Sequence, residues 1–96
     1  MAVVRQGQSI TMTAASDAYT GVVSIAGLTF QVTGGSAGDR LLVKDISGGS
    51  IIADYIVSAA TDNADLWGGR NPKFYPEGVF VNTMPSGTAV LTVITE

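Results

Sequence analysis

The sequence predicts an all-β fold, a single antiparallel β-sandwich or small jelly-roll-like barrel of six to eight short strands, in one domain spanning residues 1–96. Two observations predict this class. Glycine or runs of β-branched residues interrupt every window long enough for a helix. Runs of β-favouring residues recur along the chain instead, separated by glycine-rich turns. A chain of this length buries roughly two thirds of its unfolded surface, which is enough for one two-layer core.

The first strands are indicated by alternation. In residues 8–14, Ile10 and Met12 alternate with Thr11 and Thr13, which is typical of a half-buried strand. Residues 22–33 predict a long strand that is bulged or broken at Gly27, because an internal glycine often marks such a site. Beyond that glycine, three apolar side chains face one way and three polar side chains face the other.

Two hairpins are expected in the rest of the chain. Residues 40–46 and 51–57 flank the turn "SGGS", and two glycines between β-rich runs favour a tight turn. Residues 78–83 and 88–96 flank "MPSG", in which Gly87 can adopt a positive φ. The last run is almost wholly apolar, so it predicts an inner strand covered on both faces.

The N-terminal residues 1–8, "MAVVRQGQ", precede the first alternating strand and have no obvious place in a sandwich. We expect either an extended arm that reaches onto a neighbouring subunit or a frayed end. The segment lacks the charged-then-apolar pattern of a signal peptide, so synthesis and use in the cytoplasm of the producing cell are expected.

Charge and hydropathy argue against two classes of partner. Only 14% of the residues are charged, the net charge is −3, and the five basic residues are scattered. Without a basic stripe to neutralise phosphates, we expect no nucleic-acid partner. No apolar run approaches the ~20 residues of a membrane-spanning helix, so we expect no membrane partner. The neutral surface suits packing against neighbouring proteins, although threonine and serine could equally supply solubility.

Side chains for catalysis are scarce. The chain has no histidine and no cysteine, which excludes Ser-His-Asp triads, thiolate chemistry and imidazole zinc sites. We therefore expect no enzyme and no cofactor. Carboxylates at Asp54, Asp62, Asp65 and Glu77 could support glycoside hydrolysis, but a sandwich of this size leaves little room for a substrate groove.

The motif "DNAD" at residues 62–65 raises the question of a calcium site. It offers three oxygen-bearing side chains in four residues. Position twelve of an EF-type loop counted from Asp62 is Lys73, however, where a bidentate glutamate is needed. Asp and Asn also favour turns by capping their own backbone, so we predict turn chemistry and no metal site.

Residues 61–78 hold the only tryptophan and an unusual share of the aromatic and charged residues. Trp, Tyr and Arg are enriched at protein–protein hot spots, so we predict partner contacts by Trp67, Arg70, Phe74 and Tyr75. A second interpretation is equally open. Trp67 could plug one open end of the sandwich with Phe74 folded inward. Both interpretations hold if Trp67 is the plug while Arg70 and Tyr75 stay outside.

The layout of the chain resembles a group of small bacteriophage virion structural proteins. The stretches that carry the resemblance are "GLTFQVTGGSAGDRLLVKD", "GGSIIADYIV" and "FYPEGVFVNTMPSGTAVLTVITE", which lie within residues 22–96. The resemblance implies a head decoration, or cement, protein that binds the outer capsid lattice. It implies the major capsid protein or other virion proteins as partners, a homo-oligomer with a trimer favoured, and a place in the virion after synthesis in the host cytoplasm.

Two other functions are compatible with the sequence. A tail, collar or fibre-associated virion structural protein would share the same pattern. A small carbohydrate-binding β-sandwich module is the other alternative, because exposed Trp and Tyr rings on a sandwich can stack on sugar faces.

Overall fold

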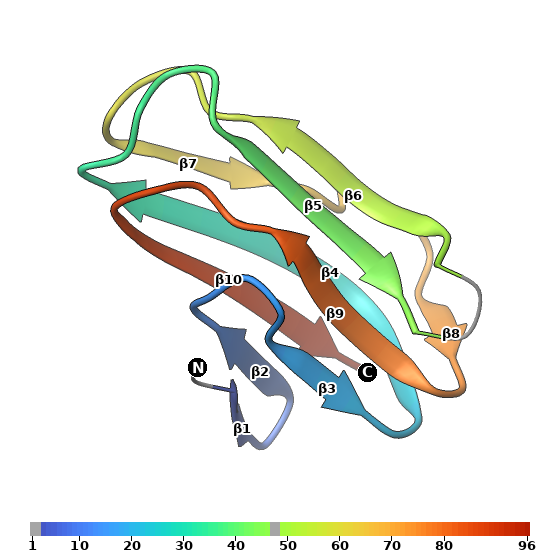
Figure 1. Cartoon of the computed structure of the whole chain (residues 1–96). Helices are drawn as coiled ribbons and strands as arrows, with labels where there is room; N and C mark the ends of the chain where they lie inside the picture. Colours follow the sequence, from blue (N-terminus) through green and yellow to red (C-terminus); the bar gives the residue numbers. More distant parts are fainter. Residues whose placement is uncertain (1–2, 47–48) are drawn as a thin grey trace.

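The computed structural model describes residues 3–46 and 49–96 as two antiparallel β-sheets packed face to face (Figure 1). Within those ranges no helix occurs, so the predicted all-β sandwich is confirmed. The first sheet, sheet A, has the strand order β1-β2-β10-β4-β7, and β8 also pairs with β4. The second sheet, sheet B, has the order β3-β9-β5-β6.

The described ranges contain ten strands, more than the six to eight expected. Sheet A comprises β1 (Val3–Gln6), β2 (Ser9–Met12), β4 (Val23–Thr33), β7 (Asp62–Asp65), β8 (Lys73–Tyr75) and β10 (Thr88–Thr95). Sheet B comprises β3 (Ala18–Thr20), β5 (Arg40–Asp45), β6 (Ile51–Ile56) and β9 (Gly78–Thr83). The excess consists of β1, β3, β7 and β8, which have three or four residues each and show no period in the sequence.

The core lies between the sheets and follows the alternation seen in the sequence. In sheet A, Met12, Leu91 and Phe30 are paired across three neighbouring strands and are fully buried. Sheet B contributes Leu41 and Val43 from β5, together with the valines of β9. Because side chains alternate between the faces of a strand, the polar residues between these positions point outward.

The predicted bulge at Gly27 is confirmed. Gly27 pairs with Ile94, but the next residue of β10, Thr95, pairs with Ile25, so Ala26 is the extra residue. A Cβ on Gly27 would lie 3.3 Å from the Cβ of Ile94. The glycine therefore allows β10 to approach β4 closely at the bulge.

One of the two expected hairpins is confirmed and the other is wrong. Strands β5 and β6 pair as predicted, although the turn residues 47–48 lie outside the described residues. Strand β9 belongs to sheet B while β10 belongs to sheet A, so residues 84–87 cross between the sheets. The turn signals mark a reversal of the chain, but packing decides which sheet receives the next strand.

The crossing at residues 84–87 contacts residues 34–39, which connect β4 to β5 and also pass from one sheet to the other. Gly87 has a φ of +83°, and a Cβ there would lie 2.6 Å from the carbonyl carbon and oxygen of Gly34. The Asp39 carboxylate accepts hydrogen bonds from the Ser86 hydroxyl at 2.6 Å and the Ser86 amide at 3.1 Å. These bonds lower the pKa of Asp39. The two crossings therefore brace each other.

The N-terminal segment, for which an arm or a frayed end was expected, is part of the fold. Residues 3–6 form β1, which pairs with β2, and residues 1–2 lie outside the described residues. Arg5 extends from β1 to sheet B, where its Nη1 donates to the Tyr19 hydroxyl at 2.6 Å and its guanidinium lies 5.2 Å from the ring centroid. The segment thus helps to close one side of the sandwich.

Strand β10 is an inner strand of sheet A, between β2 and β4, but it is not covered on both faces as expected. Its residues Ala89, Leu91, Val93 and Thr95 are buried, whereas the alternating residues from Thr88 to Ile94 are half-buried or exposed. The apolar residues on its outer face, Val90 and Ile94, stay partly exposed to solvent. Isolated apolar side chains are common on protein surfaces, so they do not indicate a covering layer.

Candidate interaction surfaces

The segment 61–78 is a divided edge strand of sheet A. Strand β7 pairs with residues 29–32 of β4, and β8 pairs with residues 23–25 of the same strand. Residues 66–72 form the turn that separates them. The segment lacks a strand period because two short strands and an irregular turn share one edge.

Trp67 fills the gap between these two strands. It is 4% exposed and belongs to the hydrophobic core. Its indole Nε1 donates to the Arg70 carbonyl at 3.0 Å, while Arg70 Nε donates to the Trp67 carbonyl at 3.1 Å. The guanidinium of Arg70 lies 4.2 Å from the centroid of the indole ring. Trp67 is therefore a plug of the sandwich, and Arg70 covers it.

The other two predicted contact residues point to opposite faces of β8. Tyr75 is buried beside Val23, whereas Phe74 is 59% exposed. Burial raises the pKa of the Tyr75 hydroxyl. The plug interpretation expected Phe74 to point inward, but Tyr75 does so instead. Tyr75 is paired with the buried Val23, and neighbouring residues of a strand point to opposite faces, so Phe74 points outward. Contact with a partner stays a prediction, and Arg70 and Phe74 are the two side chains exposed for it.

The acidic residues considered for chemistry hold local structure. Asp62 accepts hydrogen bonds from the Ser58 amide at 3.0 Å and from the Tyr55 hydroxyl at 2.5 Å. The bonds from the Ser58 backbone and from Tyr55 lower the pKa of Asp62 to about 2. Asp65 Oδ1 accepts from the amides of Trp67 and Gly68, which is the turn chemistry expected of "DNAD".

The other two candidate carboxylates, Asp54 and Glu77, lie outside the segment that holds Asp62 and Asp65 together in β7. Asp54 is paired with Arg40 on sheet B, and Glu77 is exposed in the turn before β9. Among the residues that the structure describes, no group of three or more His, Cys, Asp or Glu residues could hold a metal ion.

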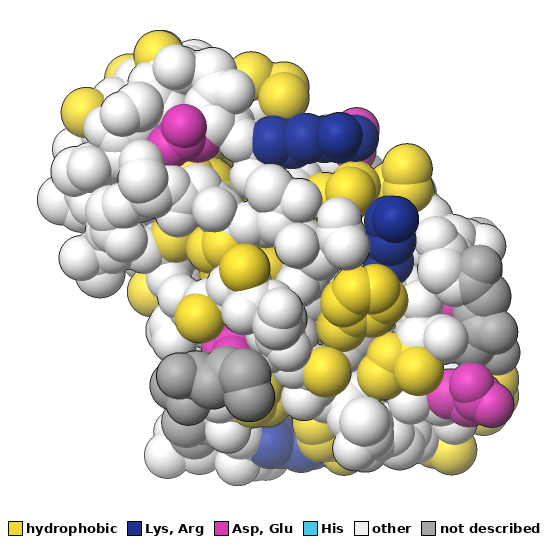
Figure 2. Space-filling model, in the orientation of Figure 1, with side chains coloured by type: hydrophobic (Ala, Val, Ile, Leu, Met, Phe, Trp, Pro, Cys, Tyr) yellow, Lys and Arg dark blue, Asp and Glu magenta, His cyan; other side chains and the backbone are white. Residues whose placement is uncertain are grey.

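The outer face of sheet B carries large apolar side chains that no third layer covers. Ile51 and Ile56 on β6 are 57% and 55% exposed. Phe80 lies on β9 at a half-buried position, and Leu42 on β5 is buried although it does not belong to the core cluster. Figure 2 shows apolar side chains gathered over β5, β6 and β9 beside basic groups. We call this surface the sheet B face.

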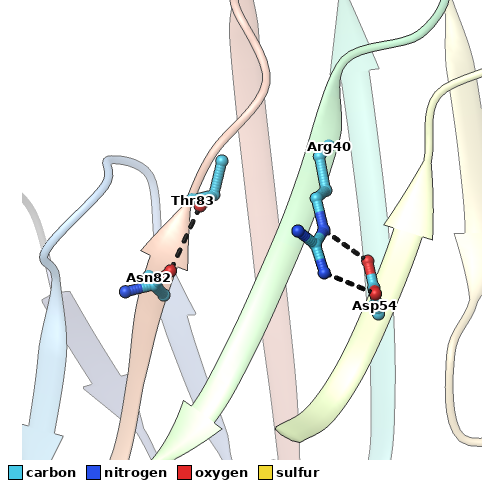
Figure 3. Close-up of polar contacts among 4 residues, drawn as sticks. All are labelled: Arg40, Asp54, Asn82 and Thr83. Carbon is cyan, nitrogen blue, oxygen red and sulfur yellow. Dashed lines mark hydrogen bonds and ion pairs between the residues drawn. The ribbon is translucent and has the colours of Figure 1, made fainter.

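An ion pair lies within the sheet B face. Arg40 Nε donates to Asp54 Oδ1 at 2.8 Å and Arg40 Nη2 donates to Asp54 Oδ2 at 2.7 Å (Figure 3). This pairing lowers the pKa of Asp54 and raises that of Arg40. On β9, Thr83 Oγ1 donates to Asn82 Oδ1 at 3.3 Å. The ion pair is bidentate, so its two charges largely neutralise each other, while Lys44 lies opposite Ile51 and Phe80 on the same face.

The outer face of sheet A has a different character. A shallow hollow of about 410 Å³ lies over β4, β7 and β10. Its polar lining consists of Thr29, Gln31, Asn63, Asp65 and Thr92. Cross-strand register places Asp65, Thr29 and Thr92 in one row, with Thr11 of β2 next in line. Amide, hydroxyl and carboxylate groups at these positions can both donate and accept hydrogen bonds.

Comparison with known proteins adds no family. No protein-family model, no curated protein and no solved structure matches the chain. In residues 3–46 and 49–96, no helix is long and apolar enough to cross a membrane.

Proposed function

We propose that the protein is a non-enzymatic structural component of a bacteriophage particle, namely a head decoration, or cement, protein that binds the outer capsid lattice. The observation that carries this proposal is the sheet B face, which leaves Ile51 and Ile56 more than half exposed next to a neutralised ion pair. An apolar centre with a paired Arg is the composition of a protein–protein contact.

The energetic argument is one of repeated modest contacts. Burial of apolar surface contributes roughly 25 cal/mol per Å², so a small patch binds weakly by itself. A decoration protein contacts its own copies and several capsid subunits at once, and such multivalency converts weak contacts into strong bracing. Low charge supports this role, because 14% charged residues leave few groups to desolvate when the surface is buried.

The virion assignment rests on the resemblance of residues 22–96 to small phage structural proteins. The proposed partners are the major capsid protein and further copies of the chain, in the virion. A tail, collar or fibre-associated position would use the same face and belongs to the same class of function.

The test begins with particles purified from the phage lysate that contains the protein. Immunogold labelling with an antibody against the purified chain should place many copies over the head. Phe80→Asp, which puts a charge on the sheet B face, should reduce the copies retained at least tenfold, while Thr29→Asp on the opposite face should not. Absence of the chain from all particles would contradict the proposal.

A second function, glycan binding, is favoured by one observation, the polar hollow on the outer face of sheet A. Neutral groups such as Gln31 and Asn63 suit sugar hydroxyls, although no aromatic ring lines the hollow except the buried Phe30. A glycan array followed by titration of a hit against Gln31→Ala tests it. Binding that the substitution abolishes would support the glycan function, and a silent array would remove it.

A further inference from the structure

The edges of the two sheets are not equally protected. An unpaired edge strand exposes backbone N–H and C=O groups that can pair with another chain, and proteins blunt such edges with short strands, interruptions or charges. Strand β3 has three residues, β1 has four and carries Arg5, and the edge of β7 and β8 is interrupted by a turn. Strand β6 has six residues, with Ile52 as an extra residue at its start, and its regular part, residues 53–56, is the last strand of sheet B.

The backbone of β6 has hydrogen-bonding groups directed away from the sheet. Val57 donates to the Asp39 carbonyl at 2.8 Å, so its amide faces β5. Consecutive residues of a strand face opposite neighbours, and therefore the N–H and C=O groups of Asp54 and Ile56 face outward. Figure 1 shows β6 at the margin of sheet B with no strand of that sheet beyond it.

The side chains of β6 do not oppose the approach of another strand. The sequence "IIADYI" contains no lysine and no proline, the residues that most often protect an edge. Its one charge, Asp54, is paired with Arg40 of β5. Ile51 and Ile56 add exposed apolar surface on the same strand. The edge is therefore apolar and close to neutral.

We propose that two copies of the chain pair antiparallel through β6 around a twofold axis at Tyr55. In this register Asp54 of each copy lies opposite Ile56 of the other, and each opposed pair exchanges both of its N–H···O bonds. The side chains of Asp54 and Ile56 in both copies stay on the sheet B face. The two four-stranded sheets join into one continuous sheet.

A second copy is the occupant that this edge fits. A twofold contact uses the same patch on both partners, so each needs only the outward groups of Asp54 and Ile56. The chain has a net charge of −3, which disfavours self-association in general, but the Arg40–Asp54 pair removes that repulsion at the seam. The pairing goes beyond the proposed virion role, because it requires no capsid.

Disulfide trapping tests the register. The chain has no cysteine, so Tyr55→Cys introduces a single thiol. Residues at a non-hydrogen-bonded antiparallel position have α-carbons about 4.5 Å apart, within the range that a disulfide spans. We expect mild oxidation to convert most of the Tyr55→Cys protein into covalent dimer. Thr20→Cys on β3, the opposite edge of sheet B, should remain monomeric under the same conditions.

Tyr55→Cys also removes the hydrogen bond from the Tyr55 hydroxyl to Asp62, which could impair folding. Ile56→Lys leaves that bond intact and provides a second test. Size-exclusion chromatography with light scattering should give a dimer for the parent chain and a dissociation constant at least tenfold weaker for Ile56→Lys. A parent chain that is monomeric at millimolar concentration, a trimer, or equal trapping of both cysteine variants would overturn the inference. These measurements use purified protein and test only the β6 pairing. The virion role is tested separately by labelling of particles, so either proposal can be contradicted without the other.

Discussion

Residues 51–56 and 61–78 both form sheet edges, yet they use their side chains in opposite ways. The segment 61–78 is rich in aromatic and charged residues, and it turns the largest of them inward: Trp67 is 4% exposed and Tyr75 is 7% exposed. The plain segment 51–56 presents Ile51 and Ile56 to solvent at more than half exposure. Composition alone would favour the first segment as the contact surface, whereas geometry favours the second.

The edge of sheet A that a turn interrupts buries a large side chain at the interruption, whereas the β6 edge does not. Between β7 and β8 no strand pairs with this edge of β4, although the Leu66 amide donates to the Leu28 carbonyl at 2.7 Å, and the turn there buries Trp67 under Arg70. Strand β6 pairs with β5 except at the extra residue Ile52 and lies at the end of sheet B, so this edge has no turn to be filled. Substitutions in the two segments test this division.

Trp67→Ala should produce the largest change. Removal of a buried tryptophan leaves a cavity and leaves the Arg70 carbonyl without its donor, so we expect a loss of about 3–5 kcal/mol in the free energy of unfolding. Urea denaturation followed by circular dichroism measures it. A loss below about 1 kcal/mol together with impaired assembly would instead make Trp67 a contact residue.

Asp62→Asn should alter the acid stability of the chain. The pKa of Asp62 is about 2 in the folded chain against an ordinary value of 3.8, so folding favours its charged form. That stabilisation is complete above pH about 5 and is lost as the pH falls toward 2. Denaturation from pH 7 to pH 2 should therefore show a smaller decline for Asp62→Asn than for the parent. Parallel profiles would contradict the assigned hydrogen bonds.

Arg70→Ala should have a smaller effect, about 0.5–1 kcal/mol, because the guanidinium stacks on Trp67 at an exposed site. Thermal unfolding can resolve a change of this size. Arg70→Lys serves as the matched control, since it keeps the charge but loses the planar stack. If Arg70→Ala leaves stability unchanged and weakens binding to particles, the side chain acts on a partner.

A matched pair of lysine substitutions gives the sharpest contrast with the smallest effect on folding. Phe74 and Ile56 are exposed to a similar extent, 59% and 55%, and lie on the two edges under comparison. Each substitution to lysine should change the free energy of unfolding by no more than about 0.5 kcal/mol. Only Ile56→Lys should weaken self-association measured by light scattering, and the reverse result would move the contact to β8.

The sequence was sufficient for the fold class because alternation reports burial directly. Ile10, Met12 and Phe30 are buried as their periodicity predicts, and the glycine at position 27 lies at the bulge. The partner sheet of β10 could not be predicted, since "MPSG" specifies a reversal but not which layer receives the strand. Packing of the two sheets decides that outcome, and the Ser86–Asp39 hydrogen bond links the two crossings.

The contact surface was harder to predict, for two physical reasons. A core plug and an interface hot spot have the same composition, so Trp67 and Arg70 fitted both. The register shift between Val43 and Lys44 then changes which residues of β6 face outward. Ile51 is exposed, and the two residues after it, Ile52 and Ala53, are both buried. Strict alternation along "IIADYI" would not bury two consecutive residues.

Cryo-electron microscopy of the particles to which the proposed virion role assigns this chain locates both the protein and the surface that it uses. We expect many copies over the capsid, with the sheet B face or the β6 edge buried in each contact and Phe74 left in solvent. Copies bound through the turn at residues 66–72, with Ile51 and Ile56 exposed, would contradict this account.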